Sequence, residues 1–328
     1  MGDHISVRRT RIAEKLAERG IEADIRDTSG LDALAAVRTA IEGDYDVILG
    51  NVRVGLYLGY PLARLLGTPF VGDVSDPLSD FEDLPWPLFR LLSAYEWFVL
   101  GHADACAFTY DETKAEADRR GIEGQKLPNA VDYDFFADPD PEAVAEAVEI
   151  LDAEGVDRSK PIAVYIGGMI EETYHLTDIV DAAERRPDWE FVFVGDGPQR
   201  DVVVDAAAEL DNVHFPGAFD YRLMPGFLAH ATAGFCLKDA EQPLKIAEYG
   251  AAGLVGVVQP GDLSERFADD EVLVSDPTGE ALAAALATLD DESVRETYAE
   301  NLRDRAKSVG WDDVAAEYDR TIRRVARE

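Results

Sequence analysis

The residues with the clearest chemical use are Lys245 and Glu248, which stand three apart just after Pro243. Proline suits the first position of a helix because its missing N–H would have no partner there, and the free amides of that first turn attract an anion. Residues three apart share a helix face, so a phosphate and a ribose hydroxyl would suit this pair. A solvated Lys/Glu pair on a surface helix is the more common arrangement, and the segment alone does not exclude it.

Two apolar runs flank this helix and indicate how it is positioned. Residues 233–237 and 254–258 have the length and composition of buried strands, and glycines between Gly250 and Gly253 end the helix that begins near Pro243. The segment 233–261 therefore predicts a crossover of strand, helix and strand.

Glycines close two further apolar runs of the same half. Gly167 and Gly168 follow the run 162–166, and Gly195, Asp196 and Gly197 follow the run 191–194. Glycine turns at the carboxyl ends of parallel strands let the backbone approach a ligand closely. Each turn alone is equally well explained as a tight connection, but both turns and the helix start are predicted at one edge of a sheet.

Strands alternate with helices along most of the chain, which favours parallel, doubly wound sheets. We expect a first domain with strands at 23–27, 47–51, 70–74, 105–109 and just before Pro128. A second domain restarts the alternation after an acidic helix at 139–155, with strands at 162–166, 191–194, 213–215, 234–237, 255–258 and 272–274. No strand precedes the first helix, 7–19, so either that strand is absent or the true start lies upstream.

The last helix carries an apolar stripe on an otherwise charged surface. Its members recur at helical spacing and need a surface on which to dock; they are Trp311, Val314, Ala315, Tyr318, Ile322 and Val325.

Composition limits the classes of partner and compartment. The 328 residues include 66 acidic and 31 basic side chains, a formal charge of -35, while 47% hydrophobic residues exclude a disordered chain. Lysine is scarce, and this balance suits a protein folded in strongly screening salt, such as the cytoplasm of a halophile. Nucleic acid is not expected as a partner, because neutralising its phosphates requires a basic surface.

Other residue types point to a reduced compartment without a metal site. Cys106 and Cys236 lie in separate apolar runs, which argues against a disulfide framework. The five histidines show no metal-ligand spacing, so no metal is predicted. No signal peptide or membrane-spanning run is expected, because Arg90 and Glu96 interrupt the best candidate, 88–100.

Aromatic residues gather near that candidate run. They would line an acceptor groove or touch a membrane that carries a lipid-linked acceptor, although their helical spacing favours core packing and no basic docking patch is evident. These residues are Trp86, Phe89, Trp97 and Phe98.

Several motifs resemble those of a known family. The runs YIGGM, FVFVGDGPQR, NVHFPGAF, EQPLKIAEYGAAG and GWDDVAAEY resemble the C-terminal domain of retaining GT-B glycosyltransferases of the GT4, or group 1, type. LGTPFVGDVSD, YEWFVLGHADA and KLPNAVDYDFF resemble the N-terminal half of the same family. The resemblance covers nearly the whole chain and is specific for fold and superfamily rather than for substrate.

The resemblance implies a GT-B fold, in which two Rossmann-like α/β domains face each other across a cleft. Residues 1–138 would form the acceptor side and 139–306 the nucleotide-sugar side, with 307–328 crossing back to the first domain. It further implies that Glu248 binds the donor ribose and that Pro243, Leu244 and Lys245 meet its diphosphate.

The implied activity is transfer of a sugar, with retention of configuration, from a UDP- or GDP-linked donor to a hydroxyl acceptor in surface glycan or glycolipid synthesis. No cofactor is implied, and the implied location is the cytoplasm or the inner face of the membrane, with peripheral membrane contact left open.

This sequence departs from the family pattern at several functional positions. Ala240 stands where the first of two glutamates is expected, and Asp239 and Glu241 flank it. Glu241 is therefore a possible replacement for the missing glutamate. Gly168 and Thr173 replace two expected phosphate-binding cations, and Arg8, Arg9 and Arg11, at the start of the first helix, are candidates to supply that charge, although basic residues on a surface helix explain them at least as well. A site altered in this way leaves open a GT-B protein that acts as a binding or partner subunit, and a phosphorylase or epimerase is a weaker alternative.

Acidic residues follow the strand 70–74, where the family often has a histidine. Ser75 and Asp76 occupy the position of a His-Asp pair, and Asp73 lies within the strand. Asp73 and Asp76 are candidates to orient or deprotonate an acceptor hydroxyl, and are equally well explained as turn residues before Pro77.

Overall fold

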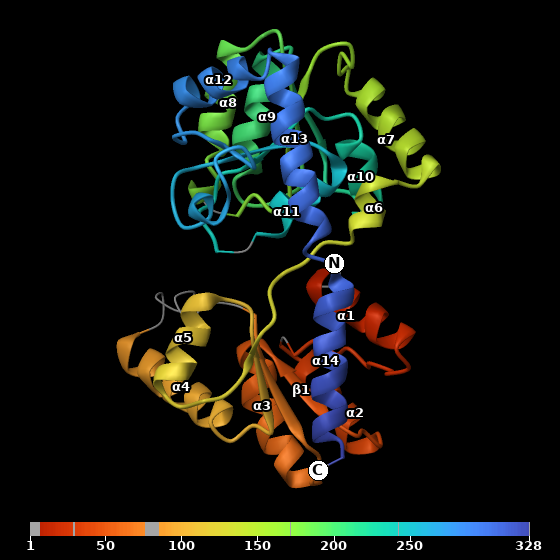
Figure 1. Ribbon diagram of the computed structural model, residues 1–328, viewed down its shortest axis with the longest axis vertical. Coiled ribbons are helices and arrows are strands. Elements are labelled where there is room, and N and C mark those ends of the chain that lie inside the picture. The colour runs from red at the N-terminus through yellow and green to blue at the C-terminus, as the bar shows by residue number, and fades with distance from the viewer. Residues whose placement is uncertain (1–6, 29, 76–84, 171, 242, 328) are drawn as a thin grey trace. The chain divides into compact units, whose positions relative to one another are not determined.

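The computed structural model describes residues 7–28, 30–75, 85–170, 172–241 and 243–327, and Figure 1 shows the ribbon. The chain forms two compact units. The first comprises Met1–Asn129 and Trp311–Glu328, and the second comprises Ala130–Gly310. Each unit contains one parallel β-sheet with helices on both faces.

The first unit is built on a four-stranded sheet with the order β1-β2-β3-β4, in which all pairs are parallel. Its elements are α1 (Val7–Glu18), α2 (Asp32–Glu42), β1 (Ile48–Asn51), α3 (Val52–Leu66), β2 (Phe70–Val74), α4 (Trp86–Leu100), β3 (Ala105–Phe108), α5 (Asp111–Arg119), β4 (Gln125–Lys126) and α14 (Trp311–Val325).

The two faces of this sheet follow from the alternation of side chains along its strands. Phe70 and Val74 of β2 pack with Leu56 of α3 and Leu100 of α4 on one face. Val71, between them in the sequence, packs on the other face with Ala105 and with Val325 of α14. The apolar stripe of α14 therefore docks on the first unit, where α14 also packs against α1.

The strand predicted at 23–27 does not form. Residues 21–28 are neither helix nor strand, and among the described residues β1 pairs with β2 alone. A β-strand needs a neighbouring strand to pair with its backbone N–H and C=O groups. Among the described residues, no strand pairs with this segment. Asp24 is held instead by side chains, since the Tyr45 hydroxyl donates to its carboxylate at 2.6 Å.

The second unit has a six-stranded parallel sheet with the order β10-β9-β8-β5-β6-β7. Its elements are α6 (Tyr133–Ala137), α7 (Pro141–Ala153), β5 (Ile162–Ile166), α8 (Leu176–Arg185), β6 (Glu190–Val194), α9 (Arg200–Glu209), β7 (Val213–Gly217), α10 (Met224–Leu228), β8 (Ala233–Cys236), α11 (Leu244–Ala252), β9 (Val255–Val258), β10 (Leu273–Val274), α12 (Gly279–Thr288) and α13 (Glu292–Lys307), with three-residue 3₁₀ turns at Glu172–Tyr174, Tyr221–Leu223 and Ser264–Arg266.

Both faces of the second sheet are buried, which explains the uninterrupted apolar runs in the sequence. Ile162, Val164 and Ile166 of β5 belong to one core cluster, and Ala163 and Tyr165 belong to the other.

The chain enters the second unit after Asn129 and returns to the first unit after Gly310. From the sequence, we expected these two domain boundaries after residues 138 and 306. The residues that differ are held by the second unit for a packing reason. Phe136 of α6 is 2% exposed and lies in a core cluster with Leu151 of α7, and Val131 bridges Gly310.

Within the described residues, no helix combines the length and the apolar character needed to cross a membrane.

Candidate functional site

The two glycine turns of the second unit are joined by backbone hydrogen bonds at the carboxyl ends of β5 and β6. The Gly167 N–H donates to the Val194 carbonyl and the Met169 N–H to the Asp196 carbonyl, each at 2.9 Å. A Cβ placed on Gly195 would lie 1.9 Å from the Gly167 oxygen, so a side chain there would displace the neighbouring turn. The glycines thus leave backbone atoms uncovered by side chains at this edge of the sheet.

Helix α11 begins beside these two glycine turns. Pro243 precedes it with φ -69°, and proline has no side-chain oxygen to cap the first amides, which suits a site for an anion. The Lys245 Nζ lies 3.4 Å from the position that a Cβ on Gly167 would take, and Gly167 has φ 126°. Leu244, the first helical residue, is half-buried.

Lys245 belongs to a cluster of cations and aromatic rings. Its Nζ lies 4.2 Å from the Tyr165 ring centroid and 5.1 Å from that of Tyr174. Lys238, just after β8, places its Nζ 5.3 Å from the same Tyr174 ring. Loss of hydration lowers the pKa of Lys245, and the positive charge of Lys238 acts in the same direction. An anionic ligand would offset both the lost hydration of the Lys245 ammonium and its repulsion by Lys238.

Glu248 lies one turn after Lys245 and is 8% exposed. The Tyr221 hydroxyl donates to its Oε1 at 2.6 Å, and the Tyr221 ring stacks on Phe135 with centroids 5.6 Å apart. The carboxylate is therefore held in a fixed orientation by a phenol that is itself fixed by packing.

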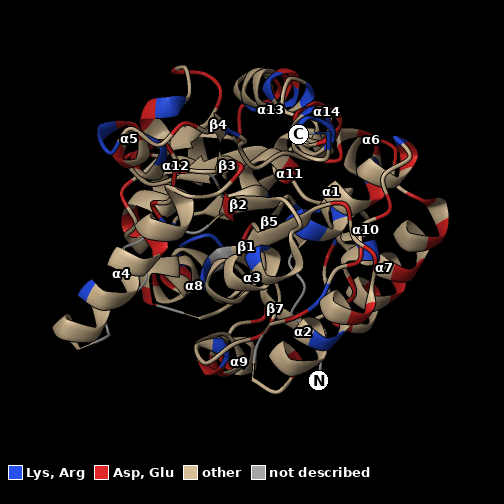
Figure 2. Ribbon diagram, turned by 90° about the horizontal axis from the view of Figure 1, so that it is seen from below, with Lys and Arg blue, Asp and Glu red and all other residues tan. Residues whose placement is uncertain are grey.

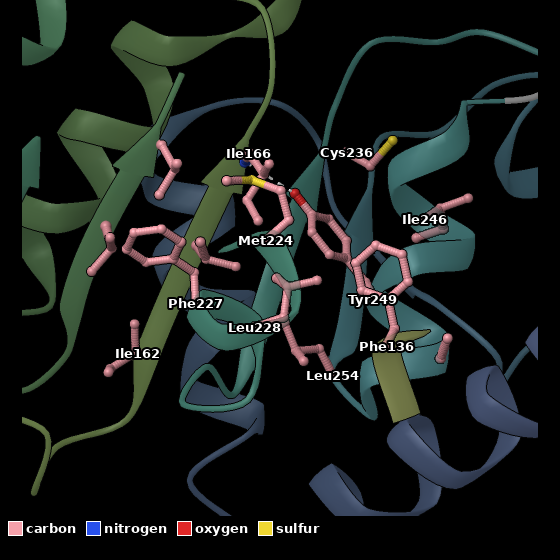
Figure 3. Packing of buried hydrophobic residues seen from close by; sticks show 14 of the residues in the cluster. Phe136, Ile162, Ile166, Met224, Phe227, Leu228, Cys236, Ile246, Tyr249 and Leu254 are labelled. Atoms are coloured by element: carbon pink, nitrogen blue, oxygen red, sulfur yellow. Dashed lines mark hydrogen bonds between the residues drawn. The ribbon is translucent and has the colours of Figure 1, made fainter. Parts of the chain in front are cut away.

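Tyr249 fixes α11 against the sheet. Figure 3 shows this side chain among the buried apolar residues, with its hydroxyl accepting from the Ile166 N–H. The same hydroxyl donates to the Phe235 carbonyl at 3.3 Å. Because Tyr249 follows Glu248 directly, these contacts also fix Glu248 relative to β5 and β8.

Replacing Tyr221 by phenylalanine is expected to lower the free energy of unfolding by about 1–2 kcal/mol, because a buried carboxylate loses a hydrogen-bond donor. Thermal denaturation in molar KCl measures this change. Tyr45→Phe is the matched control: it removes a hydroxyl bond of equal length from an exposed site and should cost less than about 0.5 kcal/mol. Equal losses for both variants would contradict the role of Tyr221.

The two carboxylates that flank Ala240 are engaged with the chain after β9. Asp239 accepts from the Asp262 and Leu263 N–H groups at 3.3 and 3.0 Å. Glu241 forms an ion pair with Arg266 at 3.2 Å. These contacts do not favour the prediction that either carboxylate replaces the missing glutamate.

Asp196 serves its own turn in the structure. Its Oδ1 accepts from the Gly197 N–H at 2.8 Å and lies 3.4 Å from an Arg200 guanidinium nitrogen. Gly168 lies beside it in the joined turns, and its carbonyl accepts from the Tyr165 hydroxyl at 2.6 Å.

Arg8 lies in the first unit and is 4% exposed. Its guanidinium donates to the Leu127 and Pro128 carbonyls at 2.9 and 2.8 Å, to the Asn129 side chain and to the Tyr318 hydroxyl. These partners make Arg8 a structural anchor and do not favour the predicted phosphate contact. Arg9 is half-buried on the same helix, and its predicted role remains a prediction.

Asp73 also lies in this buried network. It is 3% exposed, and its Oδ2 accepts from the Asn51 amide at 2.6 Å. Burial raises the pKa of Tyr318, with the nearby Asp73 carboxylate as a further cause, so that phenol stays protonated. The predicted role of Asp73 toward an acceptor hydroxyl is not favoured by this burial. Asp76 lies outside the described residues.

The sequence interpretation missed Lys238, Tyr174 and Tyr221. A signal existed for Lys238, since it directly follows a predicted parallel strand, where ligands commonly bind. The two tyrosines act through contacts that only the tertiary structure provides.

The chain matches known proteins along most of its length. The family model for glycosyl transferases group 1 matches residues 160–292, the part that contains the glycine turns and α11. A putative teichuronic acid biosynthesis glycosyltransferase of Bacillus subtilis is 26% identical over 77% of this chain, which spans 63% of that relative's length. A 2-deoxystreptamine N-acetyl-D-glucosaminyltransferase of Streptomyces fradiae is 28% identical, covering 87% of this chain and 72% of its own.

Solved structures show the same fold. The HepE protein of Anabaena, in complex with UDP and glucose, superposes with a TM-score of 0.71 at 17% identity over 94% of this chain and 87% of its own. Sucrose-phosphate synthase from Thermosynechococcus elongatus gives 0.74 at 19% identity over 96% and 92% of the two chains. The two parallel-sheet units and these solved structures show that this chain has the GT-B fold, and the family model for glycosyl transferases group 1 matches a stretch within its second unit.

Proposed function

We propose that this protein transfers a sugar from a nucleoside-diphosphate donor to a hydroxyl acceptor with retention of configuration. One observation carries the proposal: the Lys245 ammonium lies against the Gly167 turn at the start of α11, one turn from Glu248. A diphosphate bound there would meet the free amides of α11 and the Lys245 and Lys238 ammonium groups. Glu248 would accept from the ribose hydroxyls.

The chemical contribution of this arrangement is electrostatic. Breaking the bond between sugar and diphosphate leaves negative charge on the leaving group, and preorganised cations and amides stabilise it as it develops. The lowered pKa of Lys245 reflects a cation in a poorly hydrated place, where its attraction for a phosphate is stronger than in water.

The similar proteins support a nucleoside-diphosphate sugar as the donor more strongly than they support any one biosynthetic pathway. HepE of Anabaena has been solved with UDP-glucose, and both curated relatives are named as glycosyltransferases. We infer a UDP- or GDP-linked donor and an acceptor in glycan or glycolipid synthesis. Because the net charge is -35, a donor anion meets a repulsive field that salt screens, so we place the working conditions in concentrated salt.

The function is tested by adding UDP-, GDP- and dTDP-sugars to the protein in molar KCl, following thermal stability and slow release of nucleotide. One donor is expected to raise Tm and to be hydrolysed. Glu248→Gln should remove most of the response, because the amide loses the charge that holds the ribose. A donor that stabilises without transfer to any hydroxyl acceptor would favour a binding subunit, and no response in a folded sample would refute the proposal.

A further inference from the structure

The chain offers few positive charges to an anionic ligand, and two of them lie close to the first glycine turn. Acidic side chains outnumber basic ones 66 to 31, and Figure 2 shows them, in red, widely over the ribbon. The sequence from Gly167 to His175, which leads from β5 to α8, contains no lysine or arginine. Two of the seven lysines of the chain, Lys238 and Lys245, lie instead just before and just after the start of α11. The lysines beside this turn therefore come from the segment between β8 and α11.

Strand pairing places Lys238 level with the same turn. β5 and β8 are parallel neighbours, with Val164 opposite Gly234. When this register is continued by four residues along both chains, Lys238 stands opposite Gly168. Lys238 thus lies beside one of the two positions at which the sequence lacks an expected phosphate-binding cation.

The Tyr174 ring lies against both ammonium groups. The Lys245 Nζ is 5.1 Å and the Lys238 Nζ 5.3 Å from its centroid. Both distances fall within the roughly 6 Å over which the face of an aromatic ring attracts a cation. The ring therefore offsets part of the repulsion between two like charges that would otherwise move apart. The Tyr165 ring, which Lys245 also contacts, meets Tyr174 edge to face with the centroids 6.2 Å apart.

The backbone that carries Tyr174 has an uncommon conformation. His175, the next residue, has φ 56° and ψ 35°, and it is the one non-glycine residue with a positive φ in the described part of the chain. Its N–H donates to the Glu172 carbonyl at 2.9 Å, and Leu176 is 4% exposed in the core cluster of Tyr165. Backbone strain of this kind persists where surrounding contacts impose it, and such residues cluster at functional sites. These contacts fix the start of α8 and, with it, the Tyr174 ring.

Lys238 is fixed by the residues on both sides of it. Leu237 is 1% exposed in the core, and Asp239 accepts from the Asp262 and Leu263 N–H groups. Lys238 itself is half-buried. An ammonium carries three N–H donors, so Lys238 can bind a phosphate oxygen in addition to its contacts within the protein.

We propose that Lys238 binds the second phosphate of a nucleoside diphosphate, while Lys245 and the first amides of α11 bind the phosphate next to the ribose. Tyr174 is the positioning residue that keeps the two ammonium groups together. The order of the phosphates follows from α11, because Lys245 has both Glu248, one turn away, and Lys238 among its charged neighbours. This assignment rests on the proposed function, since it takes Glu248 as the ribose contact. Lys238 is then the residue that distinguishes a diphosphate from a monophosphate.

The assignment is tested with the full chain in molar KCl by titration calorimetry, using UDP against UMP and GDP against GMP. The natural sequence is expected to bind one diphosphate at least about tenfold more tightly than the matching monophosphate, because it gains a second charged contact. Lys238→Met should weaken diphosphate binding about tenfold and leave monophosphate binding unchanged, whereas Lys245→Met should weaken both. Lys307→Met is the matched control. It also removes an ammonium near a tyrosine ring of the second unit, 5.9 Å from the Tyr133 centroid, and should change neither affinity.

Two variants of Tyr174 separate positioning from folding. Tyr174→Phe keeps the ring face and should keep the preference for the diphosphate, whereas Tyr174→Leu should lose most of it. A residue that only supported the fold would lower Tm on replacement by leucine without changing the ratio of the two affinities. An unchanged ratio in Tyr174→Leu would therefore overturn the positioning role.

The possible outcomes separate the role of Lys238 from the proposed function. Lys238→Met overturns that role, and leaves the proposed function standing, if it binds the diphosphate as tightly as the natural sequence or weakens both nucleotides by the same factor. A folded natural protein that binds neither UDP nor GDP would refute both. Lys238→Gln, which keeps a polar side chain, repeats the comparison if circular dichroism shows that the methionine variant is unfolded.

Discussion

Replacing Lys245 by methionine is expected to reduce kcat/KM for sugar transfer by about 10²–10³-fold. Methionine keeps most of the length that packs on the Tyr165 ring but removes the ammonium group, which lies 4.2 Å from the centroid of that ring. Loss of one preorganised group that stabilises the leaving-group charge has an effect of this size. The measurement is nucleotide release at saturating acceptor, with the donor that raises Tm most.

Lys245→Arg and a pH series separate charge from packing in the same assay. Burial lowers the pKa of Lys245, so its ammonium is lost at a lower pH than that of an ordinary lysine. Donor affinity should therefore fall as pH rises through this lowered value, and the arginine variant should not show the fall. The unliganded protein should gain stability over the same window, up to the ordinary lysine pKa, because the unfolded chain binds more protons there. A methionine variant with unchanged kcat/KM would remove Lys245 from the site.

Replacing Arg8 by methionine is expected to destabilise the first unit by about 3–5 kcal/mol. The change leaves the Leu127 and Pro128 carbonyls without their donor and the Asp73 carboxylate without a nearby buried cation. Removing one member of a buried charged network costs this much because the others stay buried. Chemical denaturation in molar KCl, followed by circular dichroism, gives the change in free energy.

The control for this change is Arg38→Met on α2, where the guanidinium is 76% exposed and paired with Glu42. That pair should contribute less than about 0.5 kcal/mol. If the two arginine variants are equally stable, the anchor assigned to Arg8 is wrong.

The sequence predicted the strands best where both faces of a sheet are covered. β2, β5 and β9 begin and end at the predicted residues, because a strand buried on both faces is largely apolar; Asp73 of β2 is the one acidic exception in these three strands. The stripe of α14 was equally clear, since its 3.6-residue period is local. The strand at 23–27 failed because composition reports a tendency to extend, whereas a strand also needs a partner that composition does not supply.

The candidate site divides in the same way. The placement of Lys245 and Glu248 one turn apart on a helix was predictable, because proline and glycine mark where that helix begins and ends; their role in a site stays a prediction. The hydrogen bonds of Asp239 and Arg8 could not be predicted, because their partners lie 23 and more than 100 residues away in the sequence. The same holds for α3 and α4, since only the fold tells which side of an apolar helix meets water; Leu65 and Leu91 are exposed.

The docking of α14 has a consequence for how this protein is made. Residues 130–310 form the second unit as one uninterrupted stretch, so it can complete its core while the chain is still being synthesised. The first unit must wait, because Arg8 and Tyr318, which bond to each other, are 310 residues apart. The domain whose synthesis begins first is therefore the last to be finished, and until α14 arrives its sheet keeps one apolar face open to chaperones or to aggregation.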